Sequence, residues 1–336
     1  MAEKLNNTPL SYEESEYLCL SACNFFSGAN NEAIRKELGL PVEEGCIRPL
    51  SGWDFYHYLQ KIDEKFSGRL NKIRQLLPLL ERKDVLQKAG TLNTVILGEC
   101  YYYFKELTAC QQTSLLWFGD VLGLGYIQYK LSQNVIHITG ITPDGNIGNG
   151  TGFLINNKTV LTCKHVVENM VPDETVRING KEFKFEIKKH HEKDVALLVL
   201  EKEVENTFTY PVFNSPALLD DVLVMGYPPI PTADSDYLLS LKGEVNSIIY
   251  DYLNKTHNLI LSSTTRPGNS GGPVLSRDGY LVGMVIQFSL TEDSTDETLN
   301  IKDSQFPFYM AMCGDELFKY IKEIEPDIDV LFEDYQ

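Results

Sequence analysis

The sequence predicts a two-domain chain of mixed class: an all-α helical bundle, then an all-β barrel or sandwich that closes with a C-terminal helix. Its 336 residues leave room for about two domains of roughly 150 residues each. Up to about residue 128, apolar residues recur at the three- and four-residue spacing of amphipathic helices. Beyond about residue 134, short β-branched runs alternate with turn-forming residues. We therefore expect a helical domain over 1–128 and a β domain with a short acidic tail over 129–336.

The helical half is expected to contain several helices separated by glycine or proline. The end of one is marked by Gly39 followed by Pro41, because glycine readily adopts the left-handed conformation that ends helices. The segments with helical periodicity are 11–26, 30–40, 52–66, 69–83 and 95–123.

The β half is expected to contain short strands separated by turns. A final amphipathic segment, 315–324, predicts the closing helix. The predicted strand runs are 134–141, 151–155, 159–163, 175–178, 194–200, 221–227, 259–263, 279–288 and 306–312.

The charge of the chain argues against binding to polyanions. Its 47 acidic and 30 basic residues give a net charge of -17, and residues 131–336 alone hold 31 acidic and 16 basic residues. No basic stripe offsets this field, so we expect neither a nucleic acid nor an anionic membrane surface as a partner.

Cysteine usage and the N-terminal composition predict a cytoplasmic protein. The seven cysteines are odd in number and contain no CxxC pair, which argues against a disulfide framework and against a zinc ribbon. The first residues lack the basic start and the apolar core of a secretory signal. We expect reduced thiols, no metal and no cofactor.

The segment RPGNSGGPV, residues 266–274, carries the clearest chemical signal. Three glycines and a proline around Ser270 predict a tight turn that exposes the hydroxyl and leaves backbone N–H groups free. Such donors stabilise the negative charge that develops on a carbonyl oxygen in acyl transfer, and we expect them to be the N–H groups of Gly268 and Ser270. The alternative is a glycine-rich turn with a passive serine.

Two further residues supply the partners that a serine nucleophile needs. His165, in TVLTCKHVV, can act as a general base, and Asp194, in KDVALLVL, can accept the other ring N–H of the histidine. Taken singly, each has a simpler interpretation, a core histidine and a strand-start residue. Together, His165, Asp194 and Ser270 occur in this order within one β-rich segment, which favours a catalytic triad.

These motifs resemble those of trypsin-like (chymotrypsin-fold) serine peptidases, nearest the HtrA/Deg branch. The matching segments are GNGTGFLI, LTCKHVV, DVALL and GNSGGPV. The resemblance implies a double six-stranded β-barrel with the triad in the cleft between the barrels, and hydrolysis of peptide bonds through an acyl-enzyme. Asn269 stands where digestive members have an aspartate, so activation by insertion of a new N-terminus is not expected.

The same resemblance assigns the substrate pocket. Thr264, six residues before the nucleophile, would form its floor, and Ile286, Gln287 and Phe288 would form its wall. Because no carboxylate stands at position 264, we expect a neutral, small or medium side chain before the scissile bond.

Two neighbouring features receive non-functional interpretations. Adjacent histidines on a strand point to opposite faces, and no cysteine or third histidine lies near in sequence, so His190 and His191 are expected in an exposed loop rather than in a metal site. Cys163 is expected to be a buried core thiol rather than a nucleophile.

The function predicted is that of a serine endopeptidase acting on a protein or peptide. Its helical domain would recruit it to a protein partner or regulate it, and loosely resembles the adaptor modules of bacterial antiviral defence proteases. The alternative is a catalytically silent, peptide-binding scaffold (a pseudoprotease).

Overall fold

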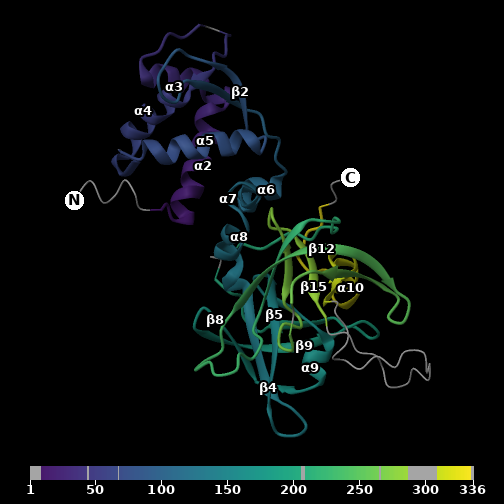
Figure 1. The fold of residues 1–336 in the computed structure, drawn as a ribbon. Coiled ribbons are helices and arrows are strands. Elements are labelled where there is room, and N and C mark those ends of the chain that lie inside the picture. The colour runs from purple at the N-terminus through teal and green to yellow at the C-terminus, as the bar shows by residue number, and fades with distance from the viewer. Residues whose placement is uncertain are drawn as a thin grey trace. The chain divides into compact units, whose positions relative to one another are not determined.

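The computed structural model describes residues 9–43, 45–66, 68–205, 209–264, 266–286 and 309–333 (Figure 1). The chain divides into two compact units. The first comprises Met1–Thr113 with Asp120–Leu122, and the second comprises Ser114–Gly119 with Gly123–Gln336. Within the described ranges, no helix is both long enough and apolar enough to cross a bilayer.

The helices of the first unit follow the apolar periodicity of the sequence. The α2 and α4 helices each begin with a capping box, in which Ser11 pairs with Glu14 and Ser51 pairs with Asp54. Gly39 ends α3 at a φ of 71°, as predicted. The main helices are α2 (Tyr12–Phe26), α3 (Asn31–Leu38), α4 (Gly52–Ile62) and α5 (Leu70–Arg82), with α6 (Ala109–Ser114) at the end of the unit.

The first unit also contains a three-stranded antiparallel sheet, so the prediction of an all-α bundle, with helix over 95–103, is wrong there. The strand order is β1 (Leu50–Ser51), β3 (Glu99–Tyr103), β2 (Leu86–Thr91). Three consecutive tyrosines lie in β3, where aromatic side chains pack well on a pleated surface. Tyr101 is buried there against Phe26 of α2, with ring centroids 5.4 Å apart.

The first sheet of the second unit has seven strands and is open. Their order is β7 (Val171–Pro172), β4 (Val135–Ile141), β5 (Ile147–Asn156), β6 (Thr159–Thr162), β10 (Ala196–Leu200), β9 (Lys181–Lys189), β8 (Thr175–Ile178). The resemblance implied a closed six-stranded barrel here, which the structure corrects. Although β8 lies beside β4, the edge position next to β4 is taken by β7, where Pro172 has no N–H to extend a ladder.

The second sheet closes into a six-stranded barrel, as predicted. The order around it is β11 (Asp221–Gly226), β12 (Leu239–Asp251), β13 (Thr256–Leu261), β16 (Tyr309–Cys313), β15 (Leu281–Val285), β14 (Pro273–Ser276). Buried valines and leucines fill its interior, including Val224, Leu259 and Val274.

Helices flank the two sheets of this unit. The predicted closing helix is present as α10 (Gly314–Ile324) and contacts β15 and β16. Ahead of the first sheet lie η3 (Leu116–Phe118) and α8 (Leu124–Leu131). Between them in the chain is α7 (Gly119–Leu122), of which Asp120–Leu122 belong to the first unit. A short helix, α9 (Lys164–Glu168), follows β6.

Candidate active site

The pairing of β6 with β10 brings His165 and Asp194 to the same end of the first sheet. These strands are antiparallel, with Thr162 opposite Ala196, so the residues after β6 meet the residues before β10. The backbone N–H of His165 donates to Asp194 Oδ1 (2.9 Å), and His165 Nδ1 lies 2.7 Å from Asp194 Oδ2. Both oxygens of the carboxylate are therefore engaged by one residue, which fixes the plane of the imidazole.

The surroundings of Asp194 keep this carboxylate ionised. Burial alone would raise the pKa of Asp194, but the hydrogen bonds and charge of His165, with the nearby Cys163 thiol, hold that pKa below its ordinary value. A carboxylate paired with Nδ1 favours the tautomer whose Nε2 is free to accept a proton. Among the described residues, Nε2 of His165 has no hydrogen-bond partner.

The turn that carries Ser270 is tight, as its glycines predict, but the expectation that it exposes the hydroxyl is wrong, because Ser270 is only 8% exposed. Gly268 and Gly271 adopt φ angles of +96° and +86°, which residues with side chains rarely adopt. The N–H groups of Asn269, Gly271 and Gly272 donate to backbone carbonyls of this loop or of β15. Within the described ranges, the N–H groups of Gly268 and Ser270 donate to no acceptor, so both predicted oxyanion donors are free.

Thr151 joins the first sheet to this loop. Its hydroxyl donates to the Gly268 carbonyl (2.6 Å) and accepts from the N–H of Tyr227 (2.9 Å). Its backbone N–H donates to the Ser270 carbonyl (2.9 Å), and its own carbonyl accepts from the Thr162 hydroxyl (2.7 Å). The side chain is fully buried. A single residue of β5 therefore contacts both residues that would form the oxyanion hole.

The Ser270 loop lies against the segment that leads to His165. A Cβ added at Gly271 would lie 2.4 Å from the Thr162 hydroxyl and 3.2 Å from the backbone nitrogen of Cys163. The structure thus brings His165 and Asp194 into direct contact and places the loop of Ser270 beside them. Within the described residues, however, the Ser270 hydroxyl makes no hydrogen bond to His165, and Ser270 is 8% exposed.

The predicted pocket residues lie on two segments of the barrel. Thr264 is exposed in the loop after β13, and Ile286 is half-buried directly after β15, where its N–H donates to the Met310 carbonyl (3.2 Å). Gln287 and Phe288 lie outside the described residues.

Cys163 is buried beneath the histidine and the aspartate. Its thiol is fully buried and donates to the Val285 carbonyl, with a sulfur–oxygen distance of 3.2 Å. Burial, reinforced by the charge of Asp194, raises the pKa of this thiol, so it is a poor nucleophile, as predicted. One possible ligand atom from each of Cys163, His165 and Asp194 lies within 4.8 Å of the others. These groups hydrogen-bond to one another and to backbone, and a protonated thiol is a poor metal ligand.

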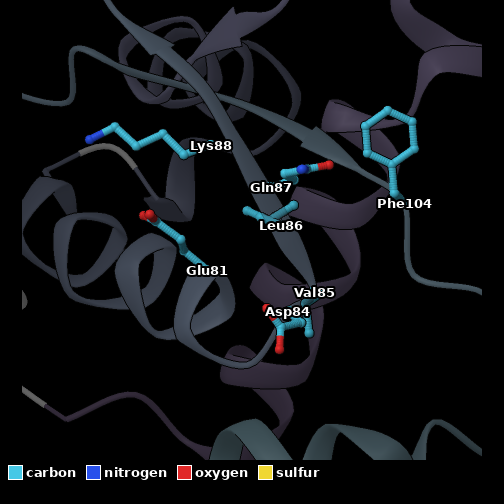
Figure 2. Close-up of a pocket in the computed structure, with 7 residues that line it drawn as sticks. All are labelled: Glu81, Asp84, Val85, Leu86, Gln87, Lys88 and Phe104. Carbon is cyan, nitrogen blue, oxygen red and sulfur yellow. The ribbon is translucent and has the colours of Figure 1, made fainter.

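A separate pocket of about 390 Å³ lies in the first unit. Figure 2 shows its lining along the end of α5 and along β2, with Phe104 at one side. No predicted catalytic residue lines it. The lining residues are Glu81, Asp84, Val85, Leu86, Gln87, Lys88 and Phe104.

Two residues with contacts near the site were not identified from the sequence. Thr151 is part of the GNGTGFLI motif, but its bond partners Gly268 and Ser270 lie far along the chain. His190 was expected in an exposed loop with its ring facing away from His191, which is wrong. His190 is only 3% exposed, and its ring stacks on that of His191 with centroids 4.4 Å apart, because residue 190 lies past the end of β9 in a turn.

Comparisons with known proteins relate part of this chain to peptidases. Residues 150–284 match the family model of the trypsin-like peptidase domain. Protease Do-like 4, mitochondrial, from Arabidopsis thaliana is 31% identical over 135 residues, which cover 38% of this chain and 25% of the relative. Protease Do-like 2, chloroplastic, from the same plant is 30% identical over 156 residues, which cover 43% and 24%. The chain spans 23% to 30% of the length of the first five curated relatives it matches.

Solved structures of proteases also resemble this chain. A protease from M. tuberculosis in its active form aligns with a TM-score of 0.47 and 19% identity, covering 59% of this chain and 84% of that one. The serine endoprotease from Yersinia pestis aligns with a TM-score of 0.45 and 16% identity, covering 66% and 69%. From the match over residues 150–284 and the identity to the Do-like relatives, we conclude that this chain contains a trypsin-like serine peptidase domain homologous to the HtrA/Deg proteases.

Proposed function

We propose that the chain is a serine endopeptidase in which Ser270 is the nucleophile, His165 the general base and Asp194 the group that orients the base. The observation that carries this proposal is the double hydrogen bond between His165 and the carboxylate of Asp194. It leaves Nε2 as the one ring nitrogen available to take a proton from a hydroxyl.

The reaction would proceed in two acyl-transfer steps. The oxygen of Ser270 bonds to the scissile carbonyl carbon while its proton moves to His165 Nε2, and the N–H groups of Gly268 and Ser270 bind the resulting oxyanion. The carbon–nitrogen bond then breaks as His165 returns the proton to the leaving amine. Water attacks the acyl-enzyme by the same route, releasing the carboxylic acid and restoring Ser270.

The proposal requires that the Ser270 hydroxyl come within hydrogen-bond reach of His165 Nε2. Catalytic hydrogen bonds are often long without substrate and tighten when substrate binds. The loop itself is fixed by Thr151, so a rotation of the Ser270 side chain is the movement we expect.

Substitution of Ser270 tests the assignment. We expect Ser270→Ala to lower turnover of a peptide library by roughly five to six orders of magnitude while leaving thermal unfolding unchanged. Ser262→Ala is the matched control, since Ser262 is exposed at the end of β13 and lies outside the loop. A fluorophosphonate probe should label the wild-type protein and the control but not Ser270→Ala. Equal labelling of all three proteins would overturn the assignment.

The substrate preference is proposed from position 264. A neutral, small or medium residue before the scissile bond fits a pocket floor made by Thr264, which carries no charge. Thr264→Asp should then gain cleavage after Arg or Lys. Cleavage-site sequencing on the peptide library measures this, and an unchanged preference would remove Thr264 from the pocket.

One observation favours the second candidate, a peptide-binding scaffold without turnover. Within the described residues, the Ser270 hydroxyl is not hydrogen-bonded to His165. The absence of fluorophosphonate labelling, even in cell extract, together with retained peptide binding, would favour the scaffold over the peptidase.

We also propose that the first unit recruits the peptidase domain to a protein partner or regulates it. Its support is the separate core of this unit, with its own helices and sheet. The seven free cysteines support a cytoplasmic location, and a role in antiviral defence is proposed only from the resemblance of the helical segment to adaptor modules. Activity of residues 114–336, measured with and without cell extract, tests this. Activity equal to that of the full chain under both conditions would contradict it.

A further inference from the structure

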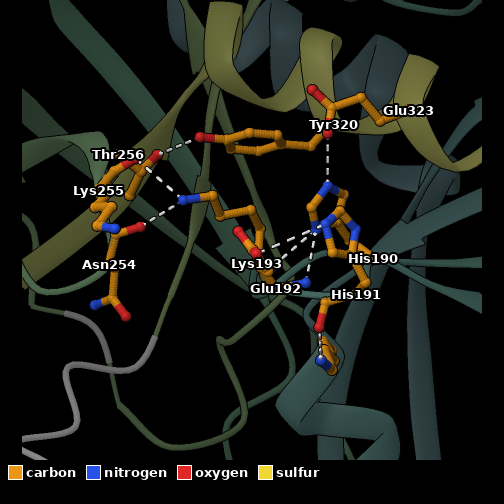
Figure 3. Close-up of polar contacts among 10 residues, drawn as sticks. His190, His191, Glu192, Lys193, Asn254, Lys255, Thr256, Tyr320 and Glu323 are labelled. Atoms are coloured by element: carbon orange, nitrogen blue, oxygen red, sulfur yellow. Dashed lines mark hydrogen bonds and ion pairs between the residues drawn. The ribbon is translucent and has the colours of Figure 1, made fainter.

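The residue Asp194 sits in a closed loop that begins at His190 and ends at Val195. The N–H of His190 donates to the Val195 carbonyl (3.0 Å), and the N–H of Val195 donates to the Lys193 carbonyl (2.8 Å). Figure 3 shows the imidazole of His190 facing the backbone of this loop on one side and α10 on the other. The imidazole of His190, which is only 3% exposed, is therefore enclosed by its own loop and by α10.

The ring of His190 satisfies two backbone donors of the loop. Its Nδ1 accepts from the N–H of Glu192 (3.1 Å) and from the N–H of Lys193 (2.8 Å). Both partners are donors, so Nδ1 is the unprotonated nitrogen of the ring. Its Nε2–H then donates to Glu323 Oε2 of α10, at 2.8 Å, and this fixes the tautomer.

Lys193 ties the same loop to the barrel. Its Nζ donates to the carbonyl oxygens of Asn254 (2.6 Å) and Lys255 (3.1 Å), in the turn between β12 and β13. The same Nζ lies 5.5 Å from the centroid of the Tyr320 ring. Both side chains are labelled in Figure 3. The residue immediately before Asp194 is thus held from two sides, by the ring of His190 at its N–H and by the barrel at its ammonium group.

We propose that His190 is a positioning residue for the active site: its Nδ1 holds the Glu192–Lys193 backbone so that both oxygens of Asp194 meet His165. The catalytic part of this inference rests on the proposed function, but the hydrogen-bond part does not. His190 acts through Asp194 and does not itself meet the substrate. Because small misplacements of a catalytic group lower the rate strongly, loss of this acceptor should lower kcat about a hundredfold with little change in KM.

Two isosteric substitutions separate the two nitrogens of the ring. In His190→Asn the side-chain oxygen can occupy the place of Nδ1 and accept from both N–H groups, while the contact with Glu323 is lost. In His190→Gln the amide nitrogen can reach Glu323, while the acceptor at Nδ1 is lost. We expect His190→Asn to retain most of the wild-type kcat and His190→Gln to lose it. Glu323→Gln, which keeps an acceptor oxygen on α10, should behave as the wild type does.

A spectroscopic measurement separates this inference from the proposed function. The proton between His165 Nδ1 and Asp194 should give a far-downfield proton NMR signal, which can be followed whether or not Ser270 reacts. His190→Gln should shift or broaden this signal and His190→Asn should not. If the wild-type protein lacks peptidase activity but the signal responds in this way, the inference stands and the proposed function fails.

Three results would overturn the inference. One is a wild-type kcat and an unshifted signal in folded His190→Gln. A second is an equal loss of kcat in folded His190→Asn and His190→Gln. The third applies if His190→Gln does not fold, so that His190→Asn is the deciding variant. If His190→Asn then loses both kcat and the downfield signal at an unchanged melting temperature, the proposed role of Nδ1 is contradicted.

Discussion

Thr151 links the two sheets of the peptidase domain through the polar atoms of one buried residue. The Gly268 carbonyl and the Tyr227 N–H both depend on its hydroxyl. The bond to the Gly268 carbonyl is buried, whereas Tyr227 is half-buried, so loss of the hydroxyl would leave at least the Gly268 carbonyl without a partner in buried surroundings. An unsatisfied buried polar group costs about 1–3 kcal/mol, so the hydroxyl matters both for stability and for the shape of the loop.

A pair of substitutions tests this role of the hydroxyl. Thr151→Val keeps the shape but removes the hydroxyl, and should lower the free energy of unfolding by about 1–3 kcal/mol for each group left without a partner. It should also slow fluorophosphonate labelling of Ser270. Thr151→Ser keeps the hydroxyl and should restore most of both properties. Urea unfolding and labelling rates measure them, and a Thr151→Val protein as stable and as reactive as the wild type would contradict the role.

The depressed pKa of Asp194 predicts how stability depends on pH. A carboxylate with a folded-state pKa below its unfolded value of about 3.9 adds stability above that pH, and this is lost as pH falls through the folded pKa. The stability difference between the wild type and Asp194→Asn should therefore be constant near neutrality and shrink below about pH 4. Urea unfolding over a pH series measures it. A difference that grows as pH falls would show that the sign is wrong.

The same substitution has a kinetic consequence. An asparagine at this position can bind the wrong tautomer of the histidine, which in a triad of this kind lowers kcat by about four orders of magnitude. The comparison with Ser270→Ala shows how much of the reaction depends on the orientation of His165.

At the scale of elements, the loop 266–272 depends on the absence of a side chain at Gly271. A Cβ there would lie 2.0 Å from the Thr151 carbonyl, a backbone atom that cannot move aside without shifting β5. The loop and β5 therefore fit only with glycine at this position.

Gly271→Ala and Gly145→Ala form a matched pair for this contact. Both glycines have a similar φ, +86° and +81°, but a Cβ at Gly145 meets no atom within 4 Å. Gly145→Ala should cost only the backbone strain, about 1–2 kcal/mol. Gly271→Ala should cost more and should abolish fluorophosphonate labelling of Ser270. Equal melting temperatures for the two variants would contradict a steric role for this contact.

The elements that the sequence predicted well are those determined by neighbouring residues. Capped helices, four of the six barrel strands (β11, β13, β15 and β16) and the glycine-rich loop depend on periodicity and turn chemistry within short segments. The strands β12 and β14 lie outside the predicted runs. The pairing of His165 with Asp194 followed from motifs in a known order.

The features that the sequence did not predict depend on distant partners. The bond from Thr151 to Gly268 spans 117 residues, and that from His190 to Glu323 spans 133. Nothing in a nearby segment distinguishes a histidine in an exposed turn from one whose ring meets a helix far along the chain. Likewise, the residues of β3 have helical spacing, but pairing with β1 and β2 makes them a strand.

At the scale of the whole chain, the peptidase unit begins before the predicted boundary at residue 128. Residues 114–119 belong to the second unit, in which Phe118 is fully buried and Leu116 and Trp117 are each 3% exposed. A Cβ at Gly279 would lie 2.6 Å from Cβ of Leu116, so this segment packs directly on the turn between β14 and β15.

Two truncated chains test where the unit begins. Residues 114–336 should fold, whereas residues 129–336 lack five large apolar side chains that are buried in the second unit, each worth about 1.5–3 kcal/mol when buried. They are Leu116, Trp117, Phe118, Tyr126 and Ile127. We expect residues 129–336 to melt at a markedly lower temperature than residues 114–336, or to remain insoluble. Calorimetry of both chains measures this, and equal melting temperatures would assign residues 114–128 to a linker.

The rate of alkylation of the buried Cys163 thiol would report how often the active-site region opens. We expect iodoacetamide to reach Cys163 only when α9, which carries His165, and the Ser270 loop separate. The exposed Cys46 in the same molecule should react without this local opening. Site-resolved mass spectrometry of alkylation at the two cysteines would therefore measure the rate of local opening at Cys163, with the rate at Cys46 as an internal reference. A transition-state analogue bound at Ser270 should slow the reaction at Cys163 and leave that at Cys46 unchanged.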